Sequence, residues 1–172
     1  MPPRLHDKRC LLIGGTSGIG LASARRFLEE GARLVIAGLD RGGVDTLSGD
    51  FLFQPCDVRE PAQVAALFDA TRQHLGSLDV LFHVAGISGR KHGDGPLHEC
   101  TDEGWHMTID ANLTSVFRTN RAAIGLFLAQ ATPGTILNMA SVLAFAPSPT
   151  HFDTVAYAAS KGGIIALSRQ AA

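Results

Sequence analysis

The sequence predicts an α/β fold, in which a doubly wound parallel sheet carries helices on both faces. Three observations predict it: short apolar runs without polar alternation recur, amphipathic segments separate them, and glycines mark the transitions. Continuous β-prone runs indicate strands buried on both faces, and strands that alternate with helices form parallel sheets. The 172 residues suffice for roughly one domain with its own core, so we expect a single domain over residues 1–172.

The first part of the chain predicts a strand, a helix and a second strand. The run Cys10–Ile13 is typical of a buried strand and stops at two glycines. A helix follows, since Ala24 and Phe27 fall on one face, and Gly31 is suited to end it in a left-handed conformation. The run Leu34–Ala37 predicts the second strand.

The same alternation continues through the middle of the chain. Val44–Leu47 favours a short helix and Phe51–Phe53 a strand. Pro61 suits the first turn of another helix, which Gly76 ends. Val80–Phe82 is the fourth predicted strand.

The remainder predicts a polar loop, a long helix, a strand and a last helix. Glycines and polar residues fill the loop Ser88–Gly95, and an apolar stripe predicts one helix from about Thr101 to Gln130. The fifth strand is Thr135–Met139, and the last helix runs from about Tyr157 to the end of the chain.

Composition excludes several classes of protein. Fifteen basic and sixteen acidic residues give a net charge of -1, which argues against a surface for nucleic acid or anionic membrane. No apolar run approaches the roughly 20 residues of a membrane span. The three cysteines Cys10, Cys56 and Cys100 are odd in number and form no CxxC motif, so we expect a reduced, cytoplasmic location.

The strongest local motif lies between the first strand and the first helix. Glycines without Cβ atoms let backbone N–H groups approach a pyrophosphate, and the positive end of the helix dipole stabilises its charge. A tight turn with close packing is the alternative, but the flanking strand and helix favour a Rossmann-like dinucleotide site. No lysine followed by serine or threonine closes the loop, which disfavours a P-loop hydrolase. The candidate cofactor-binding residues of this GxxxGxG loop are Gly14, Thr16, Ser17, Gly18, Ile19 and Gly20.

The end of the second strand should choose between NAD and NADP. An acidic side chain there bonds both ribose hydroxyls and repels a 2'-phosphate. Asp40 is suited to hold the ribose, whereas Arg41 is suited to pair with a phosphate. The residues therefore favour NAD weakly, and it stays open whether both are only solvated turn residues.

A tyrosine and a lysine stand four residues apart in the last helix. Tyr157 is the only tyrosine of the chain, and Lys161 shares its helix face. A free phenol, with a pKa of about 10, is a poor proton shuttle at neutral pH. One ammonium about 4 Å away stabilises a phenolate by about 4 kcal/mol at an effective dielectric of about 20. An exposed pair without function is the alternative reading of this motif alone.

Taken together, the motifs resemble those of the short-chain dehydrogenase/reductase family over essentially the whole chain. They occur in the order Gly14–Gly20, Cys56-Asp57-Val58, Ala85-Gly86, Asn112, Asn138-Met139-Ala140-Ser141 and Tyr157-Ala-Ala-Ser-Lys161. The resemblance implies an oxidoreductase that transfers a hydride between NAD or NADP and a small secondary alcohol or ketone. It also implies a homo-dimer or homo-tetramer.

The resemblance also implies a role for each matching residue. Tyr157 would be the general acid/base, and Lys161 would favour the tyrosinate and hold the nicotinamide ribose. Ser141 would bond the substrate oxygen, and Asn112 would hold a water that relays protons from Lys161. In the cofactor site, Asp57 would bond the adenine amino group beside Val58, while Ala85 and Gly86 would allow close backbone approach.

Each assignment has a purely structural alternative. Ser141 would then cap the end of a strand, and Asn112 would be a buried polar residue bonded to backbone. Asp57 would be the N-terminal cap of the helix that begins near Pro61.

Three positions depart from the family pattern. Ile13 stands where a threonine is usual, and His83-Val84 replace two asparagines, so we expect the cofactor site to be braced differently. The segment between Ser141 and Tyr157 is longer than usual, which makes His151 and Asp153 candidates for substrate contact.

The chain stops at Ala172, within the predicted last helix, whereas the family continues with a further helix and two strands. We therefore expect a C-terminally incomplete domain that lacks the last strands and the substrate lid, and whether this chain alone is active stays open. Two alternatives are an inactive dinucleotide-binding scaffold or sensor and an inert fragment that dimerises through its long helices. The cluster around His98-Glu99-Cys100 lacks metal-ligand spacing, so we expect no metal site.

Overall fold

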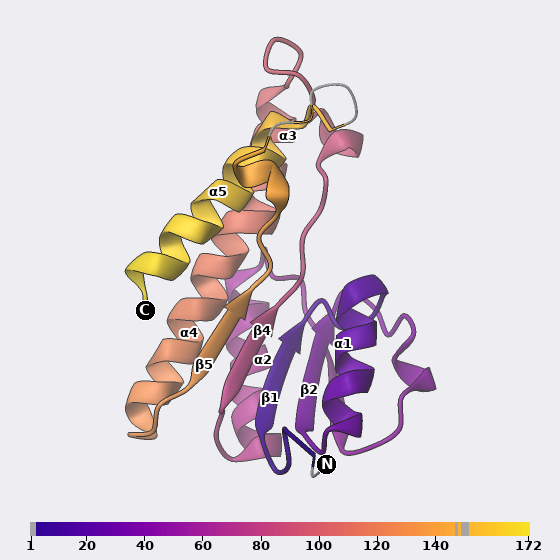
Figure 1. Ribbon diagram of the computed structural model, residues 1–172, viewed down its shortest axis with the longest axis vertical. Coiled ribbons are helices and arrows are strands. Elements are labelled where there is room, and N and C mark those ends of the chain that lie inside the picture. The colour runs from indigo at the N-terminus through magenta and orange to yellow at the C-terminus, as the bar shows by residue number, and fades with distance from the viewer. Residues whose placement is uncertain (1–2, 147, 149–151) are drawn as a thin grey trace. The chain divides into compact units, whose positions relative to one another are not determined.

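The computed structural model describes residues 3–146, 148 and 152–172 (Figure 1). In chain order its main elements are β1 (Arg9–Ile13), α1 (Gly18–Glu29), β2 (Arg33–Gly38), β3 (Phe51–Pro55), α2 (Pro61–Leu75), β4 (Val80–His83), α3 (Asp102–Ile109), α4 (Ser115–Ala129), β5 (Thr135–Asn138) and α5 (Val155–Gln170). Short 3-10 turns occupy Val44–Thr46, Arg90–His92 and Val142–Ala144, and a π-helical turn occupies Asp110–Thr114.

The chain divides into two compact units, which are described separately below. The first unit is the chain up to Ala85 together with Arg118–Leu137. The second unit is Gly86–Phe117 together with Asn138–Ala172. That one domain spans residues 1–172 stays a prediction.

A five-stranded sheet of order β3-β2-β1-β4-β5 confirms the predicted fold class. The pairs β1–β2, β1–β4 and β2–β3 are parallel, and Ile13 of β1 stands opposite both Ala37 and His83. The chain extends the sheet from β1 first to one side, through β2 and β3, and then to the other side with β4. In sheets of this kind, ligands bind beyond the carboxyl ends of the strands where the order reverses, which here is between β1 and β4.

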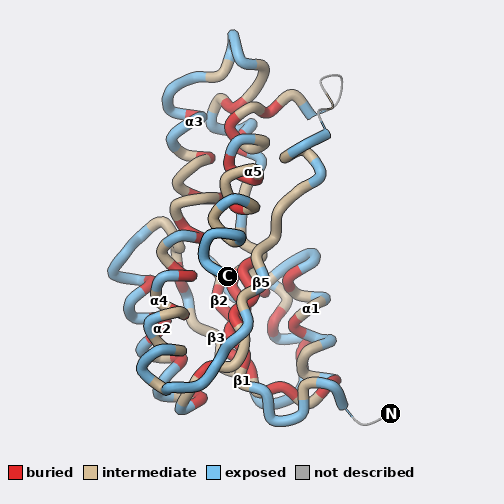
Figure 2. Tube along the Cα trace, turned by 60° about the vertical axis from the view of Figure 1, so that its left-hand side comes forward, coloured by how far each residue is buried: buried red, intermediate tan, exposed pale blue. Residues whose placement is uncertain are grey.

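Helices cover both faces of the sheet within the first unit. Leu11 and Ile13 belong to a cluster of buried residues with Leu67 of α2 and Ala123 of α4, all at most 1% exposed. On the opposite face, Phe27 of α1 and Phe82 of β4 stack with their ring centroids 6.1 Å apart. Figure 2 shows α1 on one side of the buried strands and α2 on the other. The runs of β1 and β2 lack polar alternation because these two strands are buried on both sides.

The glycine and proline signals at helix ends are confirmed. Gly31 and Gly76 follow α1 and α2 with φ of 84° and 79°. In this left-handed region a Cβ atom is strained, so glycine suits these positions. Pro61 is the first residue of α2, where its missing N–H leaves no helix hydrogen bond unmade.

The predicted helix from about Thr101 to Gln130 is confirmed in its extent, because α3, the π-helical turn and α4 follow one another without a break. Thr101 is the N-cap of α3, with Oγ1 accepting the N–H of Gly104 at 3.0 Å. The π-helical turn Asp110–Thr114 then separates α3 from α4. A π turn holds an extra residue in the helix and is frequent at functional sites, and this one contains Asn112.

Asp79→Asn is expected to lower the free energy of unfolding by about 1–2 kcal/mol at neutral pH, since charged hydrogen bonds are lost at a partly exposed site. Asp79 accepts the backbone N–H of Arg9 at 2.9 Å and its Nε at 2.8 Å, at the start of β1. These bonds lower the pKa of Asp79 below its ordinary 3.8, so its contribution is complete above that pH and is lost as the pH falls through the lowered value. Denaturant unfolding of both proteins should converge in acid, and a difference that does not depend on pH would contradict this.

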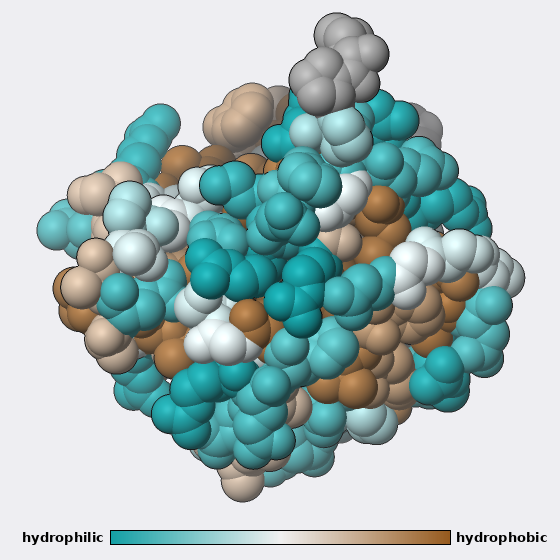
Figure 3. All heavy atoms as spheres, turned by 90° about the horizontal axis from the view of Figure 1, so that it is seen from below, coloured by the Kyte–Doolittle hydropathy of each residue, from teal (hydrophilic) through white to brown (hydrophobic). Residues whose placement is uncertain are grey.

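The surface mixes charged and apolar side chains. The face drawn in Figure 3 is mainly hydrophilic, with smaller hydrophobic areas between. Among the described residues, no helix combines the length and the apolar character that a membrane span requires.

Candidate functional site

The glycine loop after β1 is shaped by two close approaches. A Cβ on Gly14, whose φ is +85°, would lie 2.6 Å from the backbone nitrogen of Ala85. A Cβ on Gly20 would lie 1.9 Å from the carbonyl oxygen of Gly14. Only glycine fits at both positions, because a Cβ would meet backbone in each case. The loop therefore lies tightly between the ends of β1 and β4 and the start of α1.

The start of α1 is suited to an anion. Ser17 occupies the N-cap position, but no side-chain oxygen bonds the first turn, and the first turn carries no acidic residue. Helix N-termini carry partial positive charge on N–H groups that lack helix acceptors. Ser17, Gly18 and Ile19 are exposed. The loop thus has the features of a phosphate cradle, which fits a dinucleotide pyrophosphate.

The loop is also connected to the end of β2. The carbonyl oxygen of Thr16 accepts the N–H of Gly43 at 2.8 Å. Asp40 is exposed. Arg41, in contrast, donates its Nε to Asp45 at 3.0 Å, and its guanidinium carbon lies 5.3 Å from the ring centroid of Phe53. The hydrogen bond from Arg41 lowers the pKa of Asp45.

Asp57 stands just after β3 with its carboxylate engaged by Arg59. Its Oδ1 accepts the backbone N–H of Arg59 at 3.0 Å, and its Oδ2 accepts Nη2 at 2.6 Å. The side-chain hydrogen bond from Arg59 lowers the pKa of Asp57. Glu60, and not Asp57, is the N-cap of α2, so the alternative that Asp57 caps this helix is wrong. Val58 is half-buried and packs on the core cluster.

His83 and Ile13, two of the positions that depart from the family pattern, both lie in the first unit. His83 is 1% exposed, and its Nδ1 lies 2.8 Å from Oγ1 of Thr119. Ile13 is part of the core, while its carbonyl oxygen accepts the N–H groups of Val84 and Ala85 at 2.8 Å and 3.0 Å. The turn after β4 is therefore held by backbone bonds to β1 and by a buried histidine–threonine contact.

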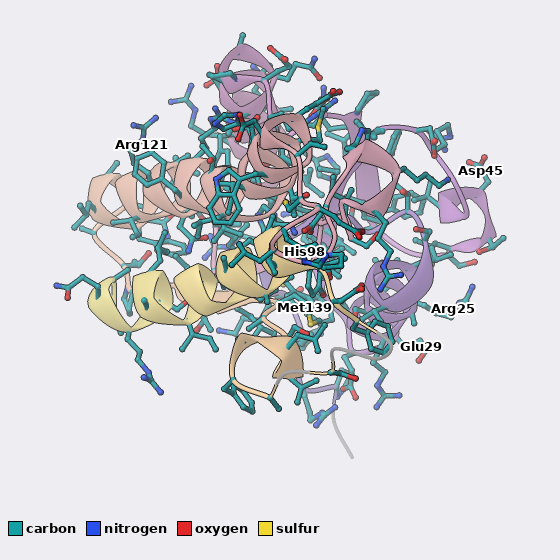
Figure 4. The ribbon with its side chains drawn as sticks, turned by 90° about the horizontal axis from the view of Figure 1, so that it is seen from above. Arg25, Glu29, Asp45, His98, Arg121 and Met139 are labelled. Atoms are coloured by element: carbon teal, nitrogen blue, oxygen red, sulfur yellow. The ribbon has the colours of Figure 1, made fainter. Side chains whose placement is uncertain are left out.

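In the second unit, Lys161 is buried beside Tyr157. Lys161 is 3% exposed, its Nζ donates to the carbonyl oxygen of Met139 at 2.7 Å, and Nζ lies 5.5 Å from the ring centroid of Tyr157. Burial lowers the pKa of Lys161. Figure 4 labels Met139, which follows β5. The buried ammonium thus lies close to the chain's only tyrosine ring.

Asn112 is fixed by three hydrogen bonds within the same unit. Its Oδ1 accepts the N–H of Ile87 at 2.7 Å, and its Nδ2 donates to the carbonyl oxygen of Ile87 at 2.9 Å and to Oγ of Ser160 at 3.1 Å. Ser160 in turn donates to the carbonyl oxygen of Tyr157 at 2.7 Å. A Cβ on Gly86 would lie 3.0 Å from Oδ1 of Asn112 and 3.5 Å from Nζ of Lys161. Asn112, Lys161 and Gly86 therefore lie close together within this unit.

Ser141 lies at the start of the 3-10 turn Val142–Ala144. Its Oγ accepts the N–H of Leu143 at 3.2 Å, so the hydroxyl serves as a local cap and keeps its own proton to donate. Asp153 pairs with Arg90, with 3.2 Å between Oδ1 and Nη2. The other candidate for substrate contact, His151, lies outside the described residues.

The predicted site residues fall in both units. The glycine loop, Asp40, Asp57, Val58 and Ala85 belong to the first unit, whereas Gly86, Asn112, Ser141, Tyr157 and Lys161 belong to the second. The four predicted catalytic residues are thus all in the second unit. Within the described part of the chain, no group of three His, Cys, Asp or Glu side chains is placed to hold a metal ion.

One residue of this region was not predicted. Asp94 lies in the Gly-Asp-Gly sequence of the polar loop, where a carboxylate is usually solvated, yet it is 5% exposed and accepts two N–H groups of α5. No periodicity or motif marks it in the sequence, and only its burial identifies it.

The chain is similar to a protein family and to curated proteins that are named dehydrogenases or reductases. A family model described as short chain dehydrogenase matches residues 8–172. The "(5R,7aS)-5-hydroxy-7a-methyl-1-oxo-2,3,5,6,7,7a-hexahydro-1H-indene-carboxyl-CoA reductase" of Mycobacterium tuberculosis is 40% identical over 163 residues, which are 89% of this chain and 59% of that protein. The "NADP-dependent (R)-specific alcohol dehydrogenase" of Lentilactobacillus kefiri is 34% identical over 182 residues, which are 100% of this chain and 68% of that protein.

Solved structures agree with the sequence relatives. The crystal structure of a short chain dehydrogenase from Mycobacterium smegmatis has a TM-score of 0.89 and 35% identity, covering 99% of this chain and 72% of that one. The chain thus spans 59% and 68% of the length of the two curated relatives above.

Proposed function

The chain belongs to the short-chain dehydrogenase family, and from this premise we propose that it is the dinucleotide-binding and catalytic part of a nicotinamide-dependent oxidoreductase. The reaction would interconvert a secondary alcohol and a ketone. The observation that carries the proposal is the buried Lys161, whose Nζ lies 5.5 Å from the ring centroid of Tyr157. A steady-state assay of secondary alcohols and ketones with NAD and NADP tests it.

Residues of the first unit would hold most of the cofactor. The N–H groups of the loop Gly14–Gly20 would bind the pyrophosphate, and the charged carboxylate of Asp57 would accept from the adenine amino group. Lys161 of the second unit would bond the nicotinamide ribose. When bound, the nicotinamide supplies or accepts the hydride.

The remaining chemistry is a proton transfer at the substrate oxygen. In ketone reduction, the O–H bond of Tyr157 breaks as its proton passes to the oxygen of the carbonyl that receives the hydride. The hydroxyl of Ser141 would donate to the same oxygen and orient it. Lys161 would stabilise the tyrosinate that remains. Asn112, fixed by its bonds to Ile87 and Ser160, would hold the water that returns a proton from solvent.

We propose that NAD binds more tightly than NADP, because Asp40 is an exposed carboxylate and Arg41 is engaged by Asp45. Asp45→Asn is therefore expected to raise the affinity for NADP relative to NAD by about threefold, since weakening one exposed ion pair frees the guanidinium for a 2'-phosphate. Direct titration of both dinucleotides measures the ratio. Asp69→Asn is the matched control, because Asp69 forms a similar exposed pair with Arg72. If Asp45→Asn leaves the ratio of NADP affinity to NAD affinity unchanged, Arg41 does not contact the cofactor.

We also propose that the protein is cytoplasmic and forms a homo-dimer or homo-tetramer. A cytoplasmic location is supported by three free cysteines, two of them buried. A homo-dimer or homo-tetramer built through the helices is supported by the exposed aromatic rings of Trp105 on α3 and Phe117 on α4.

A further inference from the structure

The helix that carries Tyr157 and Lys161 begins with backbone groups that need acceptors. α5 starts at Val155, so Tyr157 is its third residue. The first N–H groups of an α-helix have no acceptor within the helix. Thr154 occupies the N-cap position, but its side chain accepts no hydrogen bond from the helix.

A distant segment of the second unit supplies the missing acceptors. The carboxylate of Asp94 accepts the N–H of Ala156 on Oδ1 at 3.0 Å and the N–H of Tyr157 on Oδ2 at 2.9 Å. The carbonyl oxygen of Gly95 accepts the N–H of Val155 at 3.2 Å. Three successive N–H groups at the start of α5 are thus bound by two successive residues of the loop. The negative charge also lies at the positive end of the helix dipole.

Glycines pack closely around Asp94 in this loop. Gly89 and Gly93 have φ of +75° and +97°, and a Cβ on Gly89 would lie 2.8 Å from Cβ of Asp94. A Cβ on Gly104 of α3 would lie 2.4 Å from the backbone nitrogen of Asp94. The thiol of Cys100 also donates to the carboxylate, 3.8 Å from Oδ1. Glycines on both sides therefore hold the buried carboxylate in one place.

We propose that Asp94 is a positioning residue for Tyr157. Lys161 lies one turn further along α5, and its Nζ is also bound by a group outside the helix, the carbonyl oxygen of Met139. The position of the tyrosine ring relative to that ammonium then depends on the first turn of α5, which Asp94 fixes through the N–H of Tyr157 itself. Asp94 acts through Tyr157 and touches neither substrate nor cofactor. The proposal rests on the proposed function of Tyr157.

Hydrogen exchange and tyrosine-ring signals test the positioning without any substrate. In Asp94→Ala, exchange of the Ala156 and Tyr157 amides should accelerate by about tenfold or more. Asp94→Asn keeps one acceptor oxygen, so its effect should be smaller. Because the chain has one tyrosine, labelled ring resonances report Tyr157 alone, and they should shift in Asp94→Ala. Asp102→Asn, which removes an exposed carboxylate from the first turn of α3, is the matched control and should change neither signal.

Kinetics then test the consequence for the reaction. Asp94→Ala should lower kcat by about 10²-fold, the usual effect of misplacing a reacting group by about 1 Å, with KM changed by less than about twofold. Asp94→Asn should restore part of this loss. Unchanged amide exchange and ring signals in Asp94→Ala, or an unchanged kcat beside a strong loss in Tyr157→Phe, would overturn the proposal. If Tyr157→Phe itself kept full activity, the proposed function would fail, while the exchange data would still decide whether Asp94 caps α5.

Discussion

Tyr157→Phe is expected to lower kcat by at least about 10²-fold, the low end for loss of general acid/base catalysis. The substitution removes only the phenolic oxygen, which is the one group of this ring that can exchange a proton with the substrate. The ring that packs 5.5 Å from Nζ of Lys161 remains. KM should change little, because the lost interaction belongs to the transition state. Steady-state kinetics with a secondary alcohol or ketone substrate gives both values.

A loss of kcat in Tyr157→Phe indicates lost proton transfer only if the variant folds and still binds the dinucleotide. The free energy of unfolding should stay within about 0.5 kcal/mol of the parent value, as is usual where no buried partner is lost. Dinucleotide affinity should also be unchanged, since the pyrophosphate cradle belongs to the first unit. A variant that folds, binds dinucleotide and keeps its rate would show that Tyr157 is not the general acid/base.

Gly20→Ala is expected to weaken dinucleotide binding by at least about 10²-fold, because the loop cannot keep its geometry to within about 1 Å. The added Cβ would lie 1.9 Å from the carbonyl oxygen of Gly14, and backbone on both sides must move. Overpacking of this kind also lowers the free energy of unfolding by about 1–3 kcal/mol. Titration of NAD and NADP, with denaturant unfolding in parallel, separates the two effects.

Gly125→Ala provides the matched control within the first unit. Gly125 lies inside α4, and a Cβ there would meet nothing within 4 Å. Alanine should therefore stabilise the protein, by about 0.5–1 kcal/mol, and leave dinucleotide binding unchanged. Wild-type affinity in Gly20→Ala would show that the glycine loop does not hold the pyrophosphate.

The central strands β1 and β2 were predictable because they pair in parallel and are buried on both faces. β1 begins one residue before the predicted run Cys10–Ile13 and ends where that run ends, at the two glycines. The long helix was not predictable in the same detail. Trp105, Ile109 and Leu113 recur at every fourth residue, which fits an α-helix, so the π turn in this segment left no trace in the apolar pattern.

The candidate site divides in a similar way. Gly20, Asn112 and Lys161 were found because they belong to motifs that occur in a fixed order along the chain. Asp94 was not found, because its partners Ala156 and Tyr157 lie 62 and 63 residues away in the sequence. Only the fold brings such distant residues together, so no local sequence pattern predicts their hydrogen bonds.

The burial of Lys161 lowers the stability of the folded protein. Because burial lowers the pKa of this lysine from its ordinary 10.5, folding disfavours the ammonium form. The penalty is full below the lowered pKa and declines as the pH rises towards 10.5, where the unfolded chain also loses the proton. The form of Lys161 that burial disfavours is thus the charged form that the proposed chemistry requires. The role in turnover that we propose for Lys161 would account for keeping a group that lowers stability.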